Sequence, residues 1–235
     1  MIRSEARFVA RWDVGQVDGV VVAVDVLRAF TTAAYAFDAG ATAIWLADGV
    51  EEAIALGEEI PGALVMGEER GRRPAGFHLS NSPVAVAEAD VAGRQLVQRT
   101  SAGTRGVLAA TRADRVFAAS LVCASATATA VSRLGEAAPT YLVTGRFSDA
   151  PDAGLDDLLT AQLIERARLG LELEADATAK AVADSPEAAR TLAVGEGHAD
   201  PRDVSYATAV DLFGFAMEVE RVGSRRRLVR RDQQP

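Results

Sequence analysis

The 235-residue sequence predicts an α/β protein in which helices cover the faces of a mainly parallel sheet. Short runs of β-branched and apolar residues alternate with longer segments whose apolar residues recur every three or four positions, a pattern typical of parallel sheets. Hydrophobic residues make up 49% and charged residues 25% of the chain, as in an ordinary soluble globular protein. This length is sufficient for a large core, in one domain or in two lobes.

The first segments place a pair of charged residues at the end of a predicted strand. Residues 1–19 are expected to form an edge strand and a turn, and the β-branched run Val20–Val24 favours a buried strand. Asp25 follows directly, and Arg28 lies three positions later. Ligands of open α/β sheets bind beyond the carboxyl ends of the strands, so this pair stands where a binding site is expected. The alternative is that Asp25 caps a helix and Arg28 is a surface charge.

The next elements up to residue 99 follow from apolar spacing and turn residues. Phe30, Ala33, Ala34 and Phe37 lie on one helical face, and Gly40 stands where a glycine commonly ends a helix. After this helix we predict a strand over residues 43–47, a helix over 50–59, a strand over 63–66, a short helix with Pro83 in its first turn, and a strand over 95–99.

The remaining elements continue the alternation. We predict a helix ending at Thr111, a strand over residues 116–122, a helix ending near Gly135, a strand over 141–143, a helix over 155–168, non-catalytic helical structure over 174–195, a helix opening at Asp203, and a hairpin around Gly223-Ser224. When the sequence is aligned with itself at an offset of 73 positions, Val24 aligns with Val97 and Ile44 aligns with Phe117. We interpret residues 1–235 as one domain, in which this similarity reflects either chance or two similar sub-lobes over about residues 20–95 and 96–222.

The charge excludes two classes of partner. The chain has 25 Lys and Arg against 33 Asp and Glu, and its formal net charge of −8 creates no positive field for nucleic acid or an anionic membrane. The basic segment Arg225–Arg231 lacks the interleaved aromatic residues of nucleic-acid binding surfaces. No apolar run approaches the ~20 residues of a membrane helix. We therefore expect neither a nucleic acid nor a membrane as a partner.

Metal-ligating residue types are few. The single cysteine, Cys123, excludes an intramolecular disulfide and a cysteine-based zinc site. The two histidines, His78 and His198, lie far apart in the sequence. Oxygen ligands remain, and these suit Mg²⁺. Because charged residues interrupt the apolar residues at the N-terminus, we expect no secretory signal and a cytoplasmic location.

Loops after the predicted strands carry further polar groups. The segment Gly67–Pro74 combines glycines with carboxylates and arginines, and its alternative interpretation is a solvated turn. Asn81 or Ser82 can cap the short helix, whose N–H groups are then open to an anion. The segment Thr100–Arg105 joins hydroxyl groups to a glycine that lets the backbone approach a ligand. No Gly-Lys-Ser/Thr or Gly-x-Gly-x-x-Gly is present, so no motif supports nucleotide binding.

Several short motifs in a fixed order resemble one family. They are Asp25-Val26-Leu27-Arg28-Ala29, Gly67-Glu68-Glu69-Arg70-Gly71, Gly76-Phe77 with Asn81-Ser82-Pro83, Gly103-Thr104-Arg105, and Asp156-Asp157. Over about residues 20–222 the chain resembles the 2-phosphosulfolactate phosphatase family, the Mg²⁺-dependent phosphatases of coenzyme M biosynthesis. The resemblance implies a three-layer α/β/α fold with a mainly parallel or mixed sheet. It also implies hydrolysis of phosphate esters of small 2-hydroxy carboxylic acids, with sulfolactate and phosphate as products from 2-phosphosulfolactate.

The resemblance also implies roles for individual residues, and a homodimer. Asp25, Glu69 and Asp157 are expected to bind Mg²⁺ and, with Arg28, to be catalytic. The ion lowers the pKa of an attacking water, although Asp25 as a covalent nucleophile remains an alternative. The expected substrate-binding residues are Arg70, Asn81, Ser82, Thr100, Ser101, Gly103, Thr104 and Arg105. Arginine side chains suit the phosphoryl group and the carboxylate or sulfonate because they bind oxyanions with two hydrogen bonds.

Some positions depart from the family pattern. Ala102 and Cys123 stand where the family has asparagine, and His78 stands where it has aspartate. These differences remove polar groups from loops that are expected to line the cleft. They leave a second hypothesis, in which the chain is an anion-binding or regulatory protein without turnover.

Overall fold

The structure, a computed structural model, describes residues 6–135, 137–150 and 152–232. Within these ranges one ten-stranded sheet has the order β1-β8-β2-β7-β9-β10-β3-β6-β4-β5. Its strands are β1 (Arg7–Val9), β2 (Val20–Val24), β3 (Ala43–Leu46), β4 (Leu64–Gly67), β5 (Leu79–Ser80), β6 (Gln95–Arg99), β7 (Arg115–Ala119), β8 (Thr140–Val143), β9 (Phe215–Val222) and β10 (Arg225–Asp232). The helices are α1 (Arg11–Val14), α2 (Ala29–Asp38), α3 (Val50–Glu59), α4 (Pro83–Ala87), α5 (Gly103–Ala109), α6 (Ala124–Ser132), α7 (Leu155–Arg168), α8 (Ala175–Ala183), α9 (Pro186–Ala193) and α10 (Asp203–Ala207).

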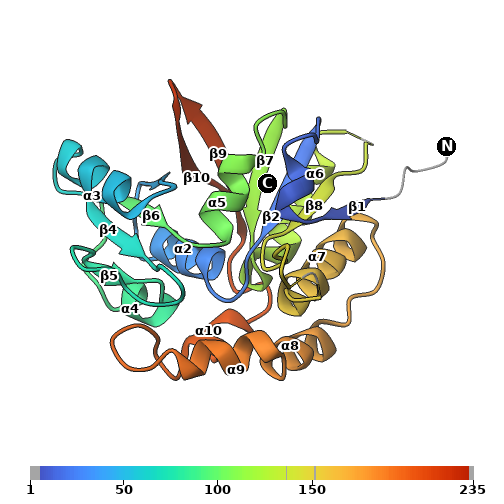
Figure 1. Cartoon of the computed structure of the whole chain (residues 1–235). Coiled ribbons are helices and arrows are strands. Elements are labelled where there is room, and N and C mark those ends of the chain that lie inside the picture. The colour runs from blue at the N-terminus through green and yellow to red at the C-terminus, as the bar shows by residue number, and fades with distance from the viewer. Residues whose placement is uncertain (1–5, 136, 151, 233–235) are drawn as a thin grey trace.

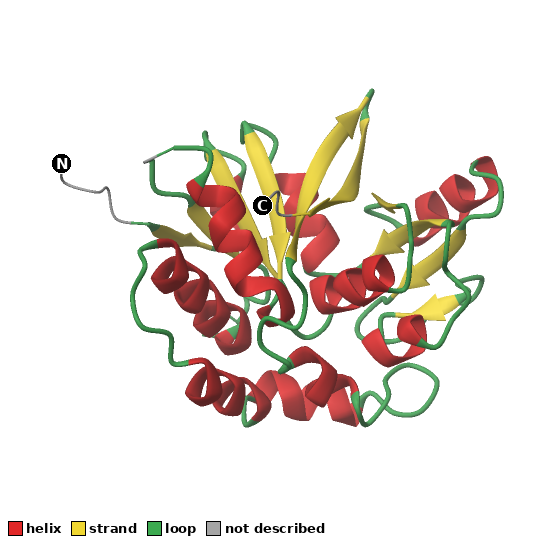
Figure 2. Cartoon of the chain, turned by 180° about the vertical axis from the view of Figure 1, so that it is seen from behind, coloured by secondary structure: helices red, strands yellow, loops and turns green. Residues whose placement is uncertain are grey.

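Two parallel halves make up the sheet, and an antiparallel hairpin joins them. β1, β8, β2 and β7 pair in parallel in one half, and β3, β6, β4 and β5 pair in parallel in the other. β9 pairs antiparallel with β7 and with β10, and β10 pairs antiparallel with β3. The sheet curls into a half-barrel from which the hairpin projects (Figures 1 and 2). The predicted α/β class with a mixed, mainly parallel sheet is confirmed.

α2 lies inside the curve of the sheet (Figure 1). The sequence pattern predicts one apolar face for this helix, but Thr31, Thr32 and Ala36 outside that face are also buried. α2 is therefore covered on all sides, which is typical of a helix in the interior of a protein. Its core contacts extend from Val21 of β2 to Leu96 of β6, so one hydrophobic cluster connects both halves of the sheet.

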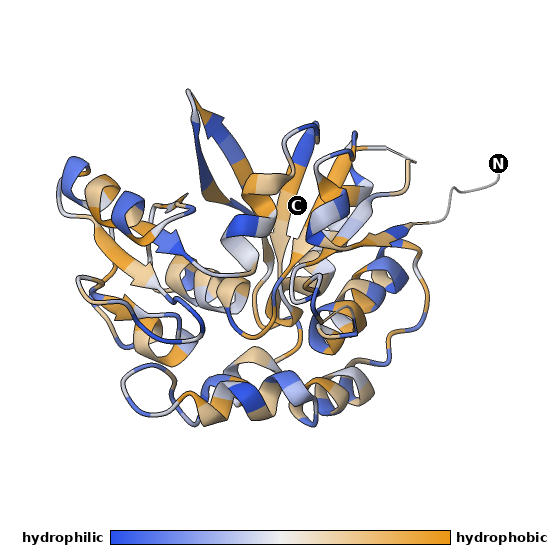
Figure 3. Ribbon diagram, in the orientation of Figure 1, coloured by the Kyte–Doolittle hydropathy of each residue, from blue (hydrophilic) through white to orange (hydrophobic). Residues whose placement is uncertain are grey.

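Helices also cover the outer face of the sheet. Val21 and Ala23 of β2 face the cluster around α2, whereas Val22 and Val24 face a second cluster with α6 and α7. This division follows from the alternation of side chains along a strand. In the other half, α3 packs on β4 and β6 through a third cluster that includes Leu56. Hydrophobic colours accordingly dominate the central strands, and hydrophilic colours mark the hairpin and the outer helices (Figure 3).

α8, α9 and α10 lie across one end of the sheet, at the bottom of Figure 1. The predicted helical segment 174–195 divides into α8 and α9, because Ser185 accepts the N–H of Ala188 and caps α9, with Pro186 in its first turn. None of the helices in the described part of the chain has the length and apolar character that a membrane span needs.

The segments related by the 73-position shift cross the sheet in opposite directions. From β2 the chain passes through α2 to β3 in the other half, and from β6 it passes through α5 back to β7. β2 then pairs with β7, and β3 pairs with β6. Strands from residues 20–95 and from residues 96–222 are therefore interleaved in one sheet.

Most predicted elements are confirmed, with a few differences at their ends. The strand predicted over residues 116–122 ends at Ala119, and Leu121–Cys123 form a 3-10 turn instead. All residues of this turn are buried, so their apolar character does not distinguish the turn from a strand. The first segment contains the short helix α1 as well as the edge strand β1, and the two-residue strand β5 has no signal in the sequence.

Candidate active site

A cavity of about 510 Å³ lies between the carboxyl ends of the parallel strands and α9. It receives residues from the segments after β2, β4, β6 and β8, from the start of α7, and from α9. The lining residues are Asp25, Leu27, Arg28, Glu68, Arg70, Gly71, Asn81, Ser101, Ala102, Gly145, Phe147, Asp156, Asp157, Glu187, Arg190, Thr191, Ala193 and Val194.

Asp25 is 5% exposed and lines this cavity. Its Oδ1 accepts the N–H of Ala29 at 2.9 Å in the first turn of α2, so the residue supports the helix as well as lining the cavity. Its Oδ2 accepts the hydroxyl of Thr144 at 3.2 Å. Burial raises the pKa of Asp25 to about 6, and Glu68 adds to this effect.

Thr144 lies between Asp25 and Asp157, two of the three carboxylates that are expected to bind Mg²⁺. Its hydroxyl group is 3.2 Å from Asp25 Oδ2 and 3.2 Å from Asp157 Oδ2. Asp157 also accepts the N–H groups of Val26 at 2.9 Å and Gly145 at 2.8 Å. Burial, with Asp156 and Asp25 nearby, raises the pKa of Asp157 well above its usual value. The structure therefore brings Asp25 and Asp157 to one place from segments that are distant in the sequence.

Asp156 and Glu187 add two more carboxylates to the same cavity. Burial is the main reason why the pKa of Asp156 rises to about 8, and Glu187 and Asp25 contribute. One oxygen of each side chain, Asp156 Oδ1 and Glu187 Oε2, is buried without a hydrogen-bond partner. Buried oxygens in this state are normally satisfied by a water or a cation.

Glu68, and not Glu69, lines the cavity. Glu68 accepts the N–H of Gly71 at 2.6 Å and the N–H of Ser101, so it connects two loops. Glu69 is 55% exposed and pairs with Arg99 at 3.2 Å, outside the residues that line the cavity. The two carboxylates are adjacent in the chain, and successive side chains in an extended segment point in opposite directions.

Arg28 is held in the cavity wall by a buried ion pair that the sequence does not reveal. Its Nη1 lies 2.7 Å from Asp203 Oδ2, and the two side chains are 4% and 0% exposed. Arg28 also donates to the carbonyl oxygens of His198 at 3.0 Å and Gly71 at 3.4 Å. The guanidinium group therefore connects the end of β2 to the β4–β5 loop and to the α9–α10 loop. In the sequence, Asp203 looks like an ordinary acidic residue in the first turn of a helix, so nothing there indicates its pairing with Arg28.

The predicted substrate-binding residues divide into those on the cavity surface and those beside it. Arg70, Asn81 and Ser101 line the cavity, and Asn81 Oδ1 is buried without a partner. Gly103 lies against Asp25, because a Cβ at this position would be 2.7 Å from Asp25 Oδ2. Because residue 103 has no side chain, the carboxylate of Asp25 has room to occupy this position.

Four predicted binding residues are placed elsewhere. Ser82 caps α4 and donates to Asp203 Oδ1 at 2.6 Å. Thr100 and Thr104 are buried and hydrogen-bonded to each other. Arg105 pairs with Asp48 at 2.8 Å and lines a different hollow. These residues are not among those that line the cavity, so their contribution is to support the loops around it.

The positions that depart from the family pattern are also mostly outside the cavity. Ala102 lines it. Cys123 is buried beside Ser120 and Thr127, and burial raises the pKa of its thiol to about 11. His78 is exposed, and its Nδ1 accepts the N–H of Val65 at 3.0 Å. Two of the three departures therefore leave the cavity surface unchanged.

The carboxylates around the cavity offer oxygen ligands to a divalent cation, but they do not form a complete set of protein ligands. Asp25 and Asp157 share a hydroxyl partner, and the partnerless oxygens of Asp156 and Glu187 are available. However, the described residues include no group of three or more His, Cys, Asp or Glu side chains arranged to hold a metal ion. Mg²⁺ commonly uses one or two carboxylates, with waters and substrate phosphate as its other ligands. The residues present fit that mode of binding.

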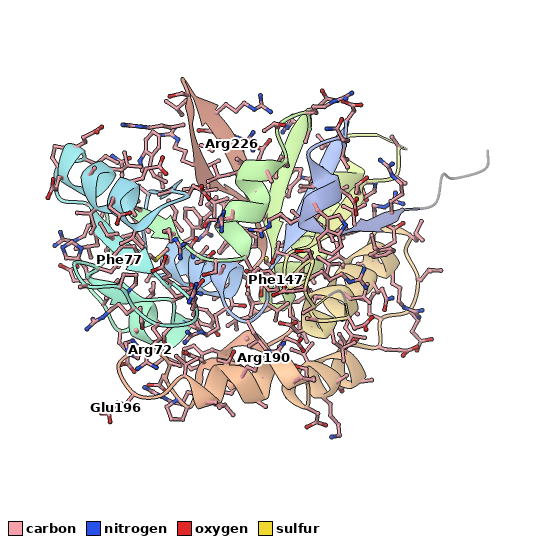
Figure 4. The ribbon with its side chains drawn as sticks, in the orientation of Figure 1. Arg72, Phe77, Phe147, Arg190, Glu196 and Arg226 are labelled. Atoms are coloured by element: carbon pink, nitrogen blue, oxygen red, sulfur yellow. The ribbon has the colours of Figure 1, made fainter. Side chains whose placement is uncertain are left out.

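α9 is the part of the site that the sequence analysis missed. The segment was expected to be helical and non-catalytic, yet its residues form one wall of the cavity. Phe147 and Arg190 border the space between the strand ends and α9 (Figure 4). No motif in residues 174–195 distinguishes this helix from an ordinary surface helix.

Comparisons with known proteins give a consistent result. The family model described as 2-phosphosulpholactate phosphatase matches residues 9–218. A protein of Thermus thermophilus is 36% identical over 207 residues, which is 87% of this chain and 79% of that protein. A protein of Bacillus subtilis is 31% identical over 203 residues, covering 86% of this chain and 87% of that protein. Both relatives are named probable 2-phosphosulfolactate phosphatase.

Proposed function

The chain belongs to the 2-phosphosulfolactate phosphatase family, and we propose that its cavity hydrolyses the phosphate ester of a small 2-hydroxy carboxylic acid such as 2-phosphosulfolactate, with Mg²⁺. The observation that carries the proposal is the pairing of Asp25 and Asp157 through Thr144 in a cavity that arginines also line. Buried carboxylates beside guanidinium groups suit a cation together with an anionic substrate.

Asp25 and Asp157 would hold Mg²⁺, with Glu68 in the lining of the same cavity. When bound, the ion supplies charge for the phosphoryl oxygens and lowers the pKa of a water molecule. Asp25 and Asp157 are held by backbone N–H groups and by Thr144, so their orientation is fixed before substrate arrives. Such preorganisation avoids a cost of reorientation during the reaction.

Arg28 would bind the phosphoryl group as it becomes more negative. Asp203 fixes its Nη1, and its Nη2 makes only a long contact of 3.4 Å with the carbonyl of Gly71. That side of the guanidinium group is therefore the one that can turn to a ligand. A positioned arginine stabilises charge on the transferring phosphoryl group.

A water molecule is a better nucleophile here than Asp25. One oxygen of Asp25 accepts the N–H of Ala29, and the other accepts the hydroxyl of Thr144 and lies against Gly103. Each oxygen keeps a second lone pair for a cation. The hydrogen bonds and the contact with Gly103 nevertheless restrict how the carboxylate could approach phosphorus, which opposes attack by Asp25 itself. We propose that water attacks phosphorus while the bond between phosphorus and the ester oxygen breaks, so that phosphate and the 2-hydroxy acid are released, and that Asp25 organises the site.

The test is phosphate release from 2-phosphosulfolactate by the purified protein. We expect activity with Mg²⁺, loss of activity with a chelator, and recovery when Mg²⁺ is restored. Asp25→Asn should abolish activity, whereas Asp18→Asn, at a position that is 65% exposed and paired with Arg112, should not change it. Full activity in Asp25→Asn, or in the presence of the chelator, would refute the proposal. Calorimetric binding of the ester without any phosphate release would favour the non-catalytic alternative.

A further inference from the structure

The cavity has two walls of different chemical character. The segments after the strands contribute the carboxylates of Asp25, Glu68, Asp156 and Asp157. The facing wall consists of α9, with Arg70 and Gly71 of the β4–β5 loop beside it. The two parts of this second wall touch, since a Cβ on Gly71 would be 3.2 Å from a methyl carbon of Val194. A substrate whose phosphate faces the carboxylate wall therefore has its remaining groups next to α9 and the loop.

Arginines on this second wall differ from Arg28 in their partners. Arg28 is buried, and the buried carboxylate of Asp203 neutralises its charge. The Arg70 side chain is exposed and has no ionic partner among the described residues. Arg190 is 62% exposed and lies 2.6 Å from Glu187 on the preceding turn of α9. Arg70 and Arg190 are thus the cavity cations that remain accessible to a ligand.

Glu187 keeps Arg190 directed toward the cavity. The Glu187 side chain is 11% exposed, and its Oε1 accepts both the N–H of Gly154 at 2.9 Å and Nη2 of Arg190. Because Gly154 precedes α7, this carboxylate is attached to the acidic side of the cavity independently of Arg190. Arg190 extends from α9 between the helix and the strand ends (Figure 4).

We propose that Arg190, assisted by Arg70, binds the anionic group of the substrate that is not the phosphate, and so determines the preference for esters that carry such a group. The inference rests on the proposed function. In 2-phosphosulfolactate the group is a carboxylate or a sulfonate, and the planar fork of arginine donates two hydrogen bonds to either one. Leu27, Phe147 and Val194 provide an apolar surface for the short carbon chain between the anions.

Steady-state kinetics with three esters test this assignment. The esters are 2-phosphosulfolactate, 2-phospholactate, which lacks the sulfonate, and p-nitrophenyl phosphate, which lacks both other anions. Arg190→Gln should lower kcat/KM for 2-phosphosulfolactate by about 10- to 150-fold, mainly through KM, because a hydrogen bond to a charged group is lost. The value for p-nitrophenyl phosphate should stay unchanged, and Arg190→Lys should restore part of the preference. A loss limited to 2-phosphosulfolactate assigns Arg190 to the sulfonate, and an equal loss with 2-phospholactate assigns it to the carboxylate.

A matched control is available on the surface. Arg112 is 53% exposed and paired with Asp18, as Arg190 is paired with Glu187, but it is not among the residues that line the cavity. Arg112→Gln should leave all three kinetic values unchanged. An equal loss of activity toward all three esters in Arg190→Gln would overturn the proposal, because it would mean a structural role. Unchanged selectivity in Arg190→Gln would overturn it as well.

Binding of sulfolactate separates this inference from the proposed function. Sulfolactate carries the carboxylate and the sulfonate but no phosphate, so its calorimetric binding does not depend on turnover. If the wild type hydrolyses no phosphate ester, the proposed function fails, and weaker sulfolactate binding in Arg190→Gln than in the wild type still supports the inference. Equal binding in both proteins, or no binding to the wild type, overturns it.

Discussion

Replacement of Asp203 by asparagine tests whether the buried ion pair holds the cavity wall. The change keeps the size of the side chain but removes the charge that neutralises Arg28, whose side chain is 4% exposed. Asp203 also accepts hydrogen bonds from Ser82 Oγ at 2.6 Å and from the N–H of Asp200 at 3.0 Å. The substitution therefore disturbs the start of α4 and the start of α10 together.

The expected loss of stability is large for a single substitution. Removing one partner of a buried ion pair costs about 3–5 kcal/mol, because the remaining charge stays buried without compensation. Domains of this size lose about 2–4 °C in Tm per kcal/mol, so Asp203→Asn should lower the Tm by about 6–20 °C. kcat/KM should fall as well, since Arg28 loses the contact that orients it.

Urea unfolding of the wild type and three variants provides the measurement. The control is Asp18→Asn, which breaks the exposed pair with Arg112 and should cost at most about 1 kcal/mol. A double variant, Arg28→Met with Asp203→Leu, should be more stable than Asp203→Asn, because it leaves no unpaired charge in the interior. If Asp203→Asn unfolds within about 1 kcal/mol of the wild type, the ion pair does not hold these loops together and the reasoning is refuted.

Substitutions at three other places have separate expected outcomes. Gly103→Ala should displace the carboxylate of Asp25, costing about 1–3 kcal/mol in urea unfolding and most of the phosphatase activity, and wild-type activity in this variant would contradict the close approach described above. Glu68→Gln should lower kcat/KM by about tenfold or more, a barrier increase of about 1.4 kcal/mol, because glutamine can accept only one of the two backbone N–H groups and turns an NH2 group toward the other. Glu69→Gln should change kcat/KM by no more than about fivefold, since exposed ion pairs contribute about 0–1 kcal/mol. A larger loss in Glu69→Gln than in Glu68→Gln would mean that Glu69, and not Glu68, acts at the site. Burial raises the pKa of Cys123 from 9.0 to about 11, so the thiol contributes its full stability below pH 9 and loses it as the pH rises through about 11. Urea unfolding between about pH 8 and pH 11 should therefore show a steeper decline for the wild type than for Cys123→Ala, and parallel curves would count against burial of this thiol.

Local patterns made much of the fold predictable. The strand β2, the helix α3 and the strand β6 have the bounds that the sequence predicts, because apolar spacing and turn residues act within a few positions. The cap of α4 is another local feature: the sequence allows Asn81 or Ser82, and the structure has Ser82. The same reasoning placed Asp25 at the end of a buried strand, where the structure has it.

The parts of the site that could not be predicted depend on packing between distant segments. Whether Glu68 or Glu69 faces the cavity is decided by the path of one loop against Ser101 and Arg99, and both residues are equivalent in a sequence pattern. Arg28 and Asp203 meet across 175 positions. α9 carries no motif, and its role follows from where α7 and α10 place it. Such contacts are properties of the assembled sheet and not of any short segment.

The hairpin β9–β10 has a consequence for synthesis of the protein. It supplies the strands that pair with β7 on one side and β3 on the other, and it is the last described structure in the chain. Asp25 and Gly145 belong to loops of one half of the sheet, and Glu68 and Ser101 belong to loops of the other. On the ribosome, the nascent chain therefore carries every residue of the cavity before the strands that unite its two sides have emerged. Premature termination shortly before residue 215 would leave a polypeptide that has every residue of the cavity lining but lacks the hairpin that joins the two halves of the sheet.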